Sequence, residues 1–571
     1  MTPSPMDTRP AAGPANRLSF PLALALALSA ASQAQAQTQT PSGAGEIGAI
    51  QRLERDQLER LRQEQRLQQR PVVPGIDLPA TPAPGAASQR QNIDVRRIEV
   101  DASAILSAAE LRAAVAPFEN RVLSLSQLYD VVAAINRLYD ARQMPTARAV
   151  LPPQDVVGGT VRIRLVEARV GEVRVGAENQ VSDRFVRERL GLREGQLLSV
   201  PELEADLVRF NRLHQAQLSA SVKPGQASGT TDVELLAQEP VARRLQTYVD
   251  NGGRNTVGEI RLGVVGQWNG LRRSDDSLQL SGVAAEGSAS VAAAYSTALT
   301  ADGWRLDTAF NADRIKIIDG PFVPLDIGGS SQIVSVGASK PLVVSAERLW
   351  LGYGRLALKS SESTFGGITQ VSSRLNVLTA GVTGDHQFDG AVWTVDANLN
   401  AGTQSRNADG SFVYLRANTA WLQPMSPQTQ WLLRAGLQAG FSPLLPSSEQ
   451  FQVGGSASVR GYAEGLLTGR SGYLLSAELR HRLHSPAADS GWPFVTGLAF
   501  VDHGAAFPFR PAPLADVTRR DFLTSAGVGA VAEWAAGVQA RVSVGWPLRN
   551  RQLDPDQSGP RVHASVTVTW Q

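Results

Sequence analysis

The sequence predicts a transmembrane antiparallel β-barrel of about 16 strands, preceded by two small α+β domains and an N-terminal helix. Three observations carry this prediction: alternating apolar and polar residues after Arg243, an internal repeat within residues 93–240, and a secretion signal. Cysteine is absent, which excludes disulfides, thiolate metal sites and Cys-based catalysis. With 55 Lys and Arg against 53 Asp and Glu, the chain lacks the basic excess that nucleic-acid binding requires.

The first 36 residues are typical of a secretion signal. Arg9 and Arg17 precede an apolar run from Leu18 to Ala31, and Ala34-Gln35-Ala36 supplies small residues for cleavage. The run is too short for a spanning helix, and no other stretch approaches the ~20 apolar residues that such a helix needs. We therefore expect residues 1–36 to be a signal peptide and the mature chain to be either soluble or a β-barrel.

Residues 45–70 are expected to form a charged helix. Its main part, Gln51 to Arg70, contains no Gly or Pro, and its leucines form only a thin stripe among charged and amide side chains. A helix with so little apolar surface suits water, a water-filled channel or a polar partner. A solvated tether is the alternative. The Pro-rich segment 71–92 then indicates an extended, semi-rigid linker.

Residues 93–240 contain two copies of one pattern. The segment from Leu123 to Leu128 aligns with that from Leu198 to Leu203, and Asn136-Arg137-Leu138 aligns with Asn211-Arg212-Leu213 (211 − 136 = 75). An ungapped match of this kind indicates tandem copies of one supersecondary unit. The two copies are placed at residues 93–167 and 168–240.

Each copy is expected to run strand, helix, helix, strand, strand. In the first copy Ser107 and Glu110 form a capping box for a short helix, and Ser126 is expected to open a longer helix to about Ala141. Such a three-stranded sheet has an edge that can accept a strand from another chain, the alternative being a spacer with a solvated edge. The expected strands are Ile93–Val100, Thr146–Val150 and Val157–Val166, then Ala168–Val175, Gln217–Lys223 and Thr231–Ala237.

Residues 243–571 alternate between apolar and polar side chains. In the strand expected at 561–570, Val, Ala and Trp share one face, and Arg, His, Ser and Thr share the other. Aromatic residues near strand ends are typical of the girdle at lipid interfaces. The 329 residues (571 − 243 + 1) give about 16 strands at roughly 20 residues per strand and connection. Residues 442–470 then form a long outer loop between the eleventh and twelfth strands.

Two short motifs lie in the last third of the chain. Val459-Arg460-Gly461-Tyr462 falls in the long outer loop, and Phe500-Val501-Asp502-His503-Gly504 falls in an amphipathic strand. A lone arginine and a lone aspartate that meet inside a barrel, shielded from bulk water, can form a bidentate pair that holds a loop in place. Ordinary turns are the alternative interpretation of each motif, but their order, spacing and strand context favour the pair.

On these motifs the chain resembles the outer-membrane transporters of two-partner secretion, the TpsB-type branch of the BamA-like superfamily. The resemblance covers almost the whole mature chain and implies POTRA domains at 93–167 and 168–240 and a 16-stranded barrel at 243–571. It implies that the sixth outer loop folds into the lumen and that the N-terminal helix plugs the resting pore. The implied pore-loop lock is an Arg460–Asp502 pair completed by Val459, Gly461, Tyr462, Phe500 and Gly504.

The resemblance implies a protein-conducting pore in the outer membrane with its POTRA domains in the periplasm. Its cargo would be a large unfolded exoprotein, a TpsA-type adhesin or haemolysin, held at the POTRA sheet edges. Outer-membrane lipid and, during biogenesis, the barrel assembly machinery would be further partners. No G-x-x-x-x-G-K-[ST] motif occurs, so secretion without nucleotide hydrolysis is expected. We expect no cofactor, no metal and no nucleic-acid partner.

Three other functions stay open. A barrel insertase would share the barrel, the POTRA domains and the Arg-Gly-Tyr loop, but commonly carries more POTRA copies and lacks the charged helix. An outer-membrane enzyme would need a site such as His503 beside Asp502, and the chain has only six histidines and no G-x-S-x-G motif. A solute porin would leave the repeated units unexplained.

Overall fold

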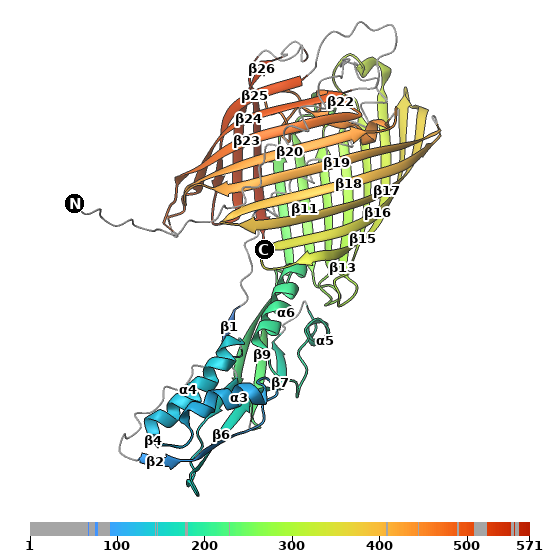
Figure 1. Ribbon diagram of the computed structural model, residues 1–571. Coiled ribbons are helices and arrows are strands. Elements are labelled where there is room, and N and C mark those ends of the chain that lie inside the picture. The colour runs from blue at the N-terminus through green and yellow to red at the C-terminus, as the bar shows by residue number, and fades with distance from the viewer. Residues whose placement is uncertain are drawn as a thin grey trace, which may run out of the picture.

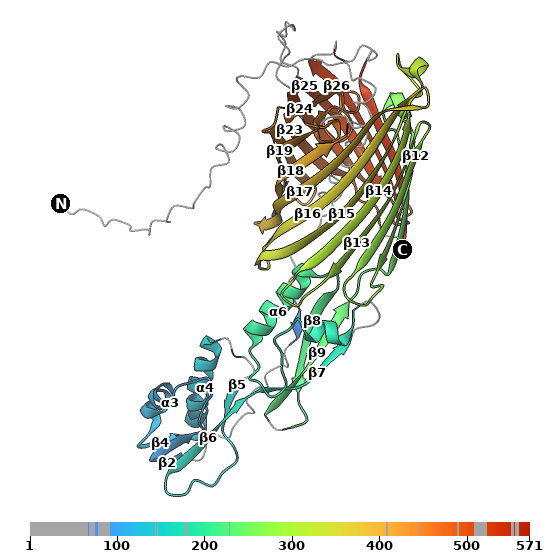
Figure 2. The ribbon, with the colours of Figure 1, turned by 90° about the vertical axis from the view of Figure 1, so that its right-hand side faces the viewer.

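The computed structural model describes most of the chain after residue 91, and these residues form a large β-barrel with two smaller mixed units below it (Figures 1 and 2). The expected signal peptide lies outside the described residues, as do the expected helix 45–70 apart from Leu67 and most of the linker 71–92. No helix in the described part is long and apolar enough to cross a membrane. The described residues are 67, 75–77, 92–142, 144, 147–176, 181–227, 229–406, 409–443, 445–487, 490–507, 522–549, 553 and 559–571.

In the part of the chain that the structure describes, sixteen antiparallel strands close into one barrel. Its first and last strands pair from Leu245 opposite Trp570 to Asp250 opposite Ser565. Closure pairs both edges, so that neither edge leaves a row of backbone groups unpaired in lipid. The strands are β10 (Arg243–Asp250), β11 (Arg261–Asn269), β12 (Ser277–Ala285), β13 (Ser288–Ala298), β14 (Arg305–Lys316), β15 (Ile327–Val344), β16 (Arg348–Phe365), β17 (Ile368–Phe388), β18 (Ala391–Ser405), β19 (Gly410–Pro424), β20 (Thr429–Gly440), β23 (Ser471–His484), β24 (Phe494–Phe507), β25 (Phe522–Glu533), β26 (Val538–Arg549) and β27 (Arg561–Trp570).

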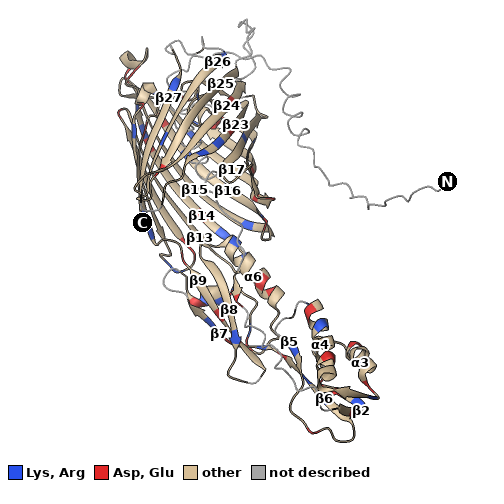
Figure 3. Ribbon diagram, turned by 90° about the vertical axis from the view of Figure 1, so that its left-hand side faces the viewer, with Lys and Arg blue, Asp and Glu red and all other residues tan. Residues whose placement is uncertain are grey.

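The two faces of the barrel wall differ in polarity, as the alternation of the sequence predicts. On β27 the exposed apolar side chains Val562, Val566 and Trp570 share the outer face. On β18 Leu399 is exposed, whereas Thr394 and Asn400 on the opposite face are buried polar residues. Most of the barrel ribbon in Figure 3 carries neither Lys, Arg, Asp nor Glu. A wall that is apolar outside and polar inside fits lipid around a wet lumen.

The first α+β unit contains the expected helices and strands in their expected order, but one strand is broken in two and a further strand, β4 (Arg121–Ser124), lies between the helices. The strand expected over 93–100 is interrupted at Arg96, because its first half pairs with β4 and its second half pairs in parallel with β6. The sheet order is β3-β6-β5, with β2-β4 as a separate pair. The elements are β2 (Asn92–Val95), β3 (Arg97–Val100), α3 (Ala108–Val115), β4 (Arg121–Ser124), α4 (Leu125–Ala141), β5 (Ala147–Val150) and β6 (Thr160–Glu167).

Capping residues set both helix starts in this unit. The expected capping box of Ser107 and Glu110 is confirmed at the start of α3. The expectation that Ser126 opens α4 is wrong, because Ser124 is the N-cap. Ser124 is in an extended conformation and forms a reciprocal capping box with Gln127, whereas Ser126 already lies in the first helical turn.

The 75-residue repeat is visible in the contacts that join helix to strand. Ser199, which is 75 residues after Ser124, is the N-cap of α6 (Val200–Leu213). The Asn136 side-chain oxygen accepts a hydrogen bond from the backbone of Ala149 at 2.7 Å. In the second unit, Asn211 accepts from the backbone of Leu218 at 2.6 Å. Each asparagine therefore fixes the long helix to the strand that follows it.

The second α+β unit differs from expectation at its sheet edge. Its strands β7 (Arg169–Gly176), β8 (Gln217–Pro224) and β9 (Thr230–Gln238) are joined by a fourth strand, β1 (Ile76–Asp77), in the order β1-β8-β9-β7. Two residues of the expected linker therefore pair with part of the edge of β8, which was expected to be free. A short helix, α5 (Asp183–Arg187), and α6 complete the unit, and α6 points toward the barrel (Figure 2).

Candidate functional site

The long segment between β20 and β23 turns back into the barrel. It forms a short hairpin of β21 (Phe451–Val453) and β22 (Leu467–Gly469). Val459 and Tyr462 are fully buried and pack with Phe451 and Val453 against Leu523 of the barrel wall. Leu523 lies opposite Gly504 on the same face as Asp502, so this packing places the segment in the lumen.

Arg460 meets Asp502 inside the barrel. Its Nε lies 2.8 Å from Asp502 Oδ2 and its Nη2 lies 2.9 Å from Oδ1, which is a bidentate pair. The backbone N–H of Arg460 also donates to Asp502 Oδ2 at 3.2 Å. Arg460 is 3% exposed and Asp502 is 0% exposed, so bulk water does not compete for these bonds.

A second carboxylate, missed by the sequence analysis, completes the site. Glu478 on β23 is fully buried and hydrogen-bonds to Arg460 Nη1. Arg480 Nε donates to its other oxygen at 2.8 Å, and Arg434 and Arg541 lie within 4 Å. The signal for Glu478 was its place on the polar face of its strand, but only the strand register sets it opposite Phe500.

Phe500 and Ser476 complete the surroundings of the guanidinium group. The ring of Phe500 lies under Arg460, whose Cζ is 3.4 Å from the ring centroid. Ser476 Oγ donates to Asp502 Oδ1 at 2.7 Å, which fixes the carboxylate from the neighbouring strand. The arginine is thus held by charge on two sides and by an aromatic face on a third.

The remaining motif residues allow the loop to approach the wall closely. The Tyr462 hydroxyl donates to the Thr524 backbone oxygen at 3.0 Å. A Cβ on Gly461 would lie 2.6 Å from the side chain of Ser525, and one on Gly504 would lie 2.9 Å from Val453. Glycine at both positions therefore permits contacts that any side chain would block.

Glu449 forms a second anchor on other strands. It is fully buried in a short 3₁₀ segment, η5 (Ser447–Glu449), and receives a hydrogen bond from Lys359 Nζ of β16 at 2.6 Å. The Tyr414 hydroxyl of β19 donates to its other oxygen at 2.8 Å. The loop is therefore tied to β16 and β19 as well as to β23 and β24, and it crosses the lumen. No motif in the sequence identified Glu449.

Leu67 lies in the same lumen. It is helical, 5% exposed, and packs against Val392, Ala420 and Leu432. Ala420 on β19 lies opposite Thr394, a buried polar residue of the inner face. Leu432 lies opposite Leu422, which is on the same face of β19 as Ala420. The one described residue of the expected N-terminal helix is therefore inside the barrel.

With this geometry in view, the chain can be compared with known proteins. The pattern of the family described as "Haemolysin secretion/activation protein ShlB/FhaC/HecB" matches residues 229–529, and that of the ShlB-type POTRA domain matches residues 93–168. The chain belongs to this family. It is an outer-membrane transporter of the two-partner secretion type, with its POTRA region in the periplasm.

Individual relatives agree with this assignment. The outer membrane transporter CdiB of Escherichia coli O6:K15:H31 is 26% identical over 480 residues, covering 78% of this chain and 80% of the relative. The heme/hemopexin transporter protein HuxB of Haemophilus influenzae is 25% identical and covers 77% of this chain and 80% of its own length. The solved structure of Escherichia coli CdiB superposes with a TM-score of 0.65, at 21% identity, over 94% of this chain and all of that one.

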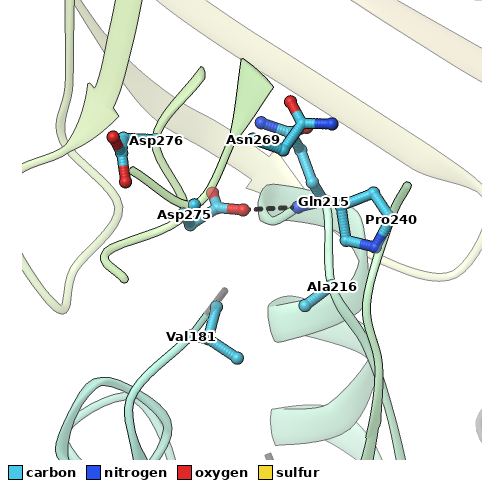
Figure 4. A pocket seen from close by; sticks show the side chains of 8 residues that line it. Val181, Gln215, Ala216, Pro240, Asn269, Asp275 and Asp276 are labelled. Carbon is cyan, nitrogen blue, oxygen red and sulfur yellow. Dashed lines mark hydrogen bonds between the residues drawn. The ribbon is translucent and has the colours of Figure 1, made fainter. Parts of the chain in front are cut away.

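The periplasmic mouth of the transporter is a polar junction between α6 and the barrel turns. Arg212 of α6 pairs with Asp385 of β17 at 2.6 Å. Asp275 lies in the turn between β11 and β12. Its carboxylate is 2.8 Å from Arg305 Nη1 and accepts a hydrogen bond from the backbone N–H of Gln215 at 2.7 Å. Figure 4 shows the hydrogen bond between Asp275 and Gln215 among the residues that line a small pocket there. These contacts fix the angle between the second α+β unit and the barrel.

His214 and Asp275 are titratable groups at this junction. His214 Nδ1 lies 2.9 Å from Asp275, and the His214 ring packs against Phe185 and Phe210. Burial lowers the pKa of His214 and outweighs the hydrogen bond to Asp275. Burial alone would raise the pKa of the Asp275 carboxyl, but the hydrogen bond from His214 and the charge of Arg305 hold it below its usual range. A neutral His214 thus donates from Nδ1 to an ionised Asp275.

Proposed function

We propose that the chain is a protein-conducting pore that secretes a large unfolded exoprotein of the TpsA type through its lumen, without nucleotide hydrolysis or other catalysis. The observation that supports this most is the position of Leu67, which lies buried against the lumen wall. A lumen with room for Leu67 and for the loop residues 451–469 of its own chain also has room for an extended polypeptide. The helix 45–70 would leave the lumen when cargo enters.

The domain and site assignments are part of this proposal. Residues 1–36 would be the signal peptide, 45–70 the plug helix, 71–92 the linker, and 168–240 a second POTRA domain after the first at 93–167. The lock of Val459, Arg460, Gly461, Tyr462, Phe500, Asp502 and Gly504 would hold the loop across the lumen. Glu478 and Glu449 would belong to the same lock.

Exoprotein capture would use the POTRA sheet edges. No described strand pairs with the outer side of β5, which is bonded only to β6. Main-chain hydrogen bonds from such an edge bind an extended segment with little dependence on its sequence. This property suits a transporter whose cargo arrives unfolded.

Secretion tests the proposal directly. The full chain would be co-expressed with candidate TpsA-type exoproteins from the same genome in a bacterial host that has an outer membrane. The culture supernatant would then be assayed for the exoprotein. We expect export that depends on this chain and stays intact when ATP is depleted after the exoprotein has reached the periplasm. Exoprotein that stays in the periplasm for every candidate would refute the secretion function.

One observation favours the alternative, a barrel insertase. The seam between β10 and β27 has six registered pairs, whereas β26 and β27 share eight. An insertase would open such a seam toward lipid, whereas a pore would keep it closed.

A further inference from the structure

A group of polar and aromatic side chains lies on the outer wall of the barrel. His503 alternates along β24 with the inward-facing Asp502, so it faces outward like the exposed Val501. Its Nε2 lies 2.9 Å from the Tyr473 hydroxyl of β23, and its Nδ1 lies 2.8 Å from Thr524 Oγ1 of β25. These polar groups satisfy one another, as a wall in contact with lipid requires.

One cation beside this group has no such partner. Arg549, the last residue of β26, is exposed and lies opposite Thr524. Its guanidinium carbon lies 5.1 Å from the ring centroid of Phe522. Within the described part of the chain, the guanidinium group forms no hydrogen bond and no ion pair. Its N–H donors are therefore available to an anion that reaches the wall from outside.

The group lies at the outer end of the barrel. β10 follows the second α+β unit directly and successive strands reverse direction, so β24 and β26 run away from that unit (Figure 1). Phe507 and Arg549 are the last residues of these two strands. Nearer the middle of the same wall, Val501, Val528 and Trp546 are exposed. A molecule bound here would place its anionic part at the rim and its apolar part along the wall.

These features fit a phosphate of lipid A, the glycolipid that anchors lipopolysaccharide in the outer leaflet. A phosphate accepts two parallel N–H bonds from one guanidinium group. The rings of Tyr473, His503 and Phe522 form a row, with neighbouring centroids 5.6 and 5.4 Å apart, on which the C–H faces of a sugar can stack. A glycerophospholipid would offer a phosphate without the sugar. The row of rings therefore favours lipid A.

The loop inside the barrel contacts the same strands from the other side. The pairing of β25 and β26 shifts register between Thr524, opposite Arg549, and Ser525, opposite Pro547. At this bulge the Tyr462 hydroxyl of the loop donates to the Thr524 backbone oxygen at 3.0 Å and accepts from the Arg549 N–H at 3.3 Å. The bulge thus joins the backbone of the outward-facing arginine to the loop.

We propose that the outer wall around Arg549 is a binding site for a phosphate of lipid A. Tyr473, His503 and Phe522 supply the aromatic surface for its sugar. An occupied site holds the bulge in the geometry that Tyr462 binds, so the lipid and the loop stabilise each other. The site requires an outer-membrane barrel and is independent of the cargo and of secretion.

Native mass spectrometry of the full chain in detergent tests the site. The probes are lipid A with its phosphates, the same lipid after removal of the phosphates, and phosphatidylglycerol as a second anionic lipid. We expect phosphorylated lipid A to bind about tenfold to a hundredfold more tightly than the dephosphorylated form, because charged hydrogen bonds are lost with the phosphate. Arg549→Gln should remove this difference. Arg549→Lys should restore part of it, because it keeps the charge but not the fork.

Arg374→Gln is the matched control. Arg374 is exposed and alternates along β17 with the inward-facing Leu375, but serines lie opposite it on both neighbouring strands. Its removal should leave lipid A binding unchanged. Equal binding by the natural chain and Arg549→Gln would overturn the site. An equal loss in both arginine variants would also overturn it, since general charge attraction would then suffice. Phosphatidylglycerol bound as tightly as lipid A would overturn lipid A as the ligand.

Tyr462→Phe tests the link to the loop. Tyr462 faces the lumen and cannot touch a lipid outside the barrel, and this change removes only its hydroxyl. Because the coupling is reciprocal, we expect lipid A to bind this variant about fivefold more weakly than the natural chain. Circular dichroism would verify that the variant keeps its strand content. Natural affinity for lipid A in folded Tyr462→Phe would overturn the link.

Discussion

The burial of Arg460 decides the energetics of the loop. A guanidinium group removed from water loses several kcal/mol of hydration, and only well-placed partners recover this loss. Asp502 recovers it through two hydrogen bonds, Glu478 through a third, and Phe500 through its ring face. Removal of Arg460 would leave the buried Asp502 without its cation, and removal of Asp502 would leave Arg460 with Glu478 and the ring of Phe500. The site is therefore sensitive to single substitutions, and a second substitution within the pair should add little to the loss caused by the first.

This argument gives a prediction for the lock. Arg460→Ala and Asp502→Ala should each destabilise the docked loop by about 3–5 kcal/mol, and the double variant should be little worse than either. Arg541→Ala is the matched control, because Arg541 is more exposed and lies 3.8 Å from Glu478. Secretion and thermal unfolding of the detergent-solubilised chain would be measured. Strictly additive losses would contradict the pairing.

A second prediction concerns His214 at the periplasmic mouth. The pKa of His214, measured by NMR on the full chain, should lie below its ordinary 6.5 because burial disfavours the charged ring. Asp275→Asn should lower it further, because Asp275 stabilises the cation. Arg189→Ala should raise it, because a neighbouring positive charge is removed. Shifts of the same sign in both variants would refute this electrostatic account.

The stability of the junction follows from the same pKa. The unfolded chain takes up the proton at about pH 6.5, whereas folded His214 takes it up only at lower pH. The contribution of His214 is therefore fully present above pH 6.5 and is lost as the pH falls toward the folded pKa. Asp275 acts in the same direction at lower pH, because its folded pKa is also lowered. The contact between the second α+β unit and the barrel should weaken in acid.

At the scale of elements, the position of a segment depends on which surface of the rest of the chain it can pack against. The helix expected at 45–70 has little apolar surface, yet Leu67 reaches an apolar patch of Val392, Ala420 and Leu432 in a mostly polar lumen. The linker has no hydrophobic stripe, yet its extended backbone finds an unpaired strand edge at β8. Both contacts are small.

The helix supplies the third prediction. Deletion of residues 51–70 should increase the open-channel current in planar bilayers, because it removes the segment that carries Leu67 into the lumen. Leu67→Asn should increase the opening frequency in the same direction, because a polar side chain loses the burial of roughly 1.5–3 kcal/mol that a leucine gains. Leu67→Met conserves volume and should behave like the natural chain. An unchanged current after the deletion would remove the plug role.

At the scale of the whole molecule, a closed barrel can act through its lumen or through its seam. The seam lies between β10 and β27, where Gln246 on the inner face faces Thr569 and donates to its hydroxyl at 3.4 Å. The family assignment and the segments inside the lumen favour transport through the lumen.

The fourth prediction tests this choice. A Gln246→Cys/Thr569→Cys disulfide should close the seam and leave secretion unchanged, because cargo does not pass between the strands. The reduced form of the same variant is its control. Loss of secretion on oxidation, recovered on reduction, would show that the seam must open and would support the insertase mechanism.

The sequence by itself determined the barrel, its strand number and the repeated units. Alternation with period two specifies which side chains of a strand face lipid and which face the lumen. A one-residue slip would exchange the two sets, so the pattern fixes the register locally. The capping box at Ser107 was also predicted, because it acts within one turn, whereas the repeat only aligned the asparagines at 136 and 211 and did not give their hydrogen bonds to the next strand. The misplaced start of α4 at Ser126 was an error of two residues between neighbouring serines.

Only the tertiary structure decided the partners that come from distant parts of the chain. Glu478 and Glu449 join the lock because closure brings four strands around one loop, and neither residue belongs to a motif. The pairing of β1 with β8 spans some 140 residues, and no local pattern records which of several edges a short extended segment will meet. Periodicity encodes the face that a residue occupies, whereas the identity of its neighbour across a cavity depends on how the whole sheet closes.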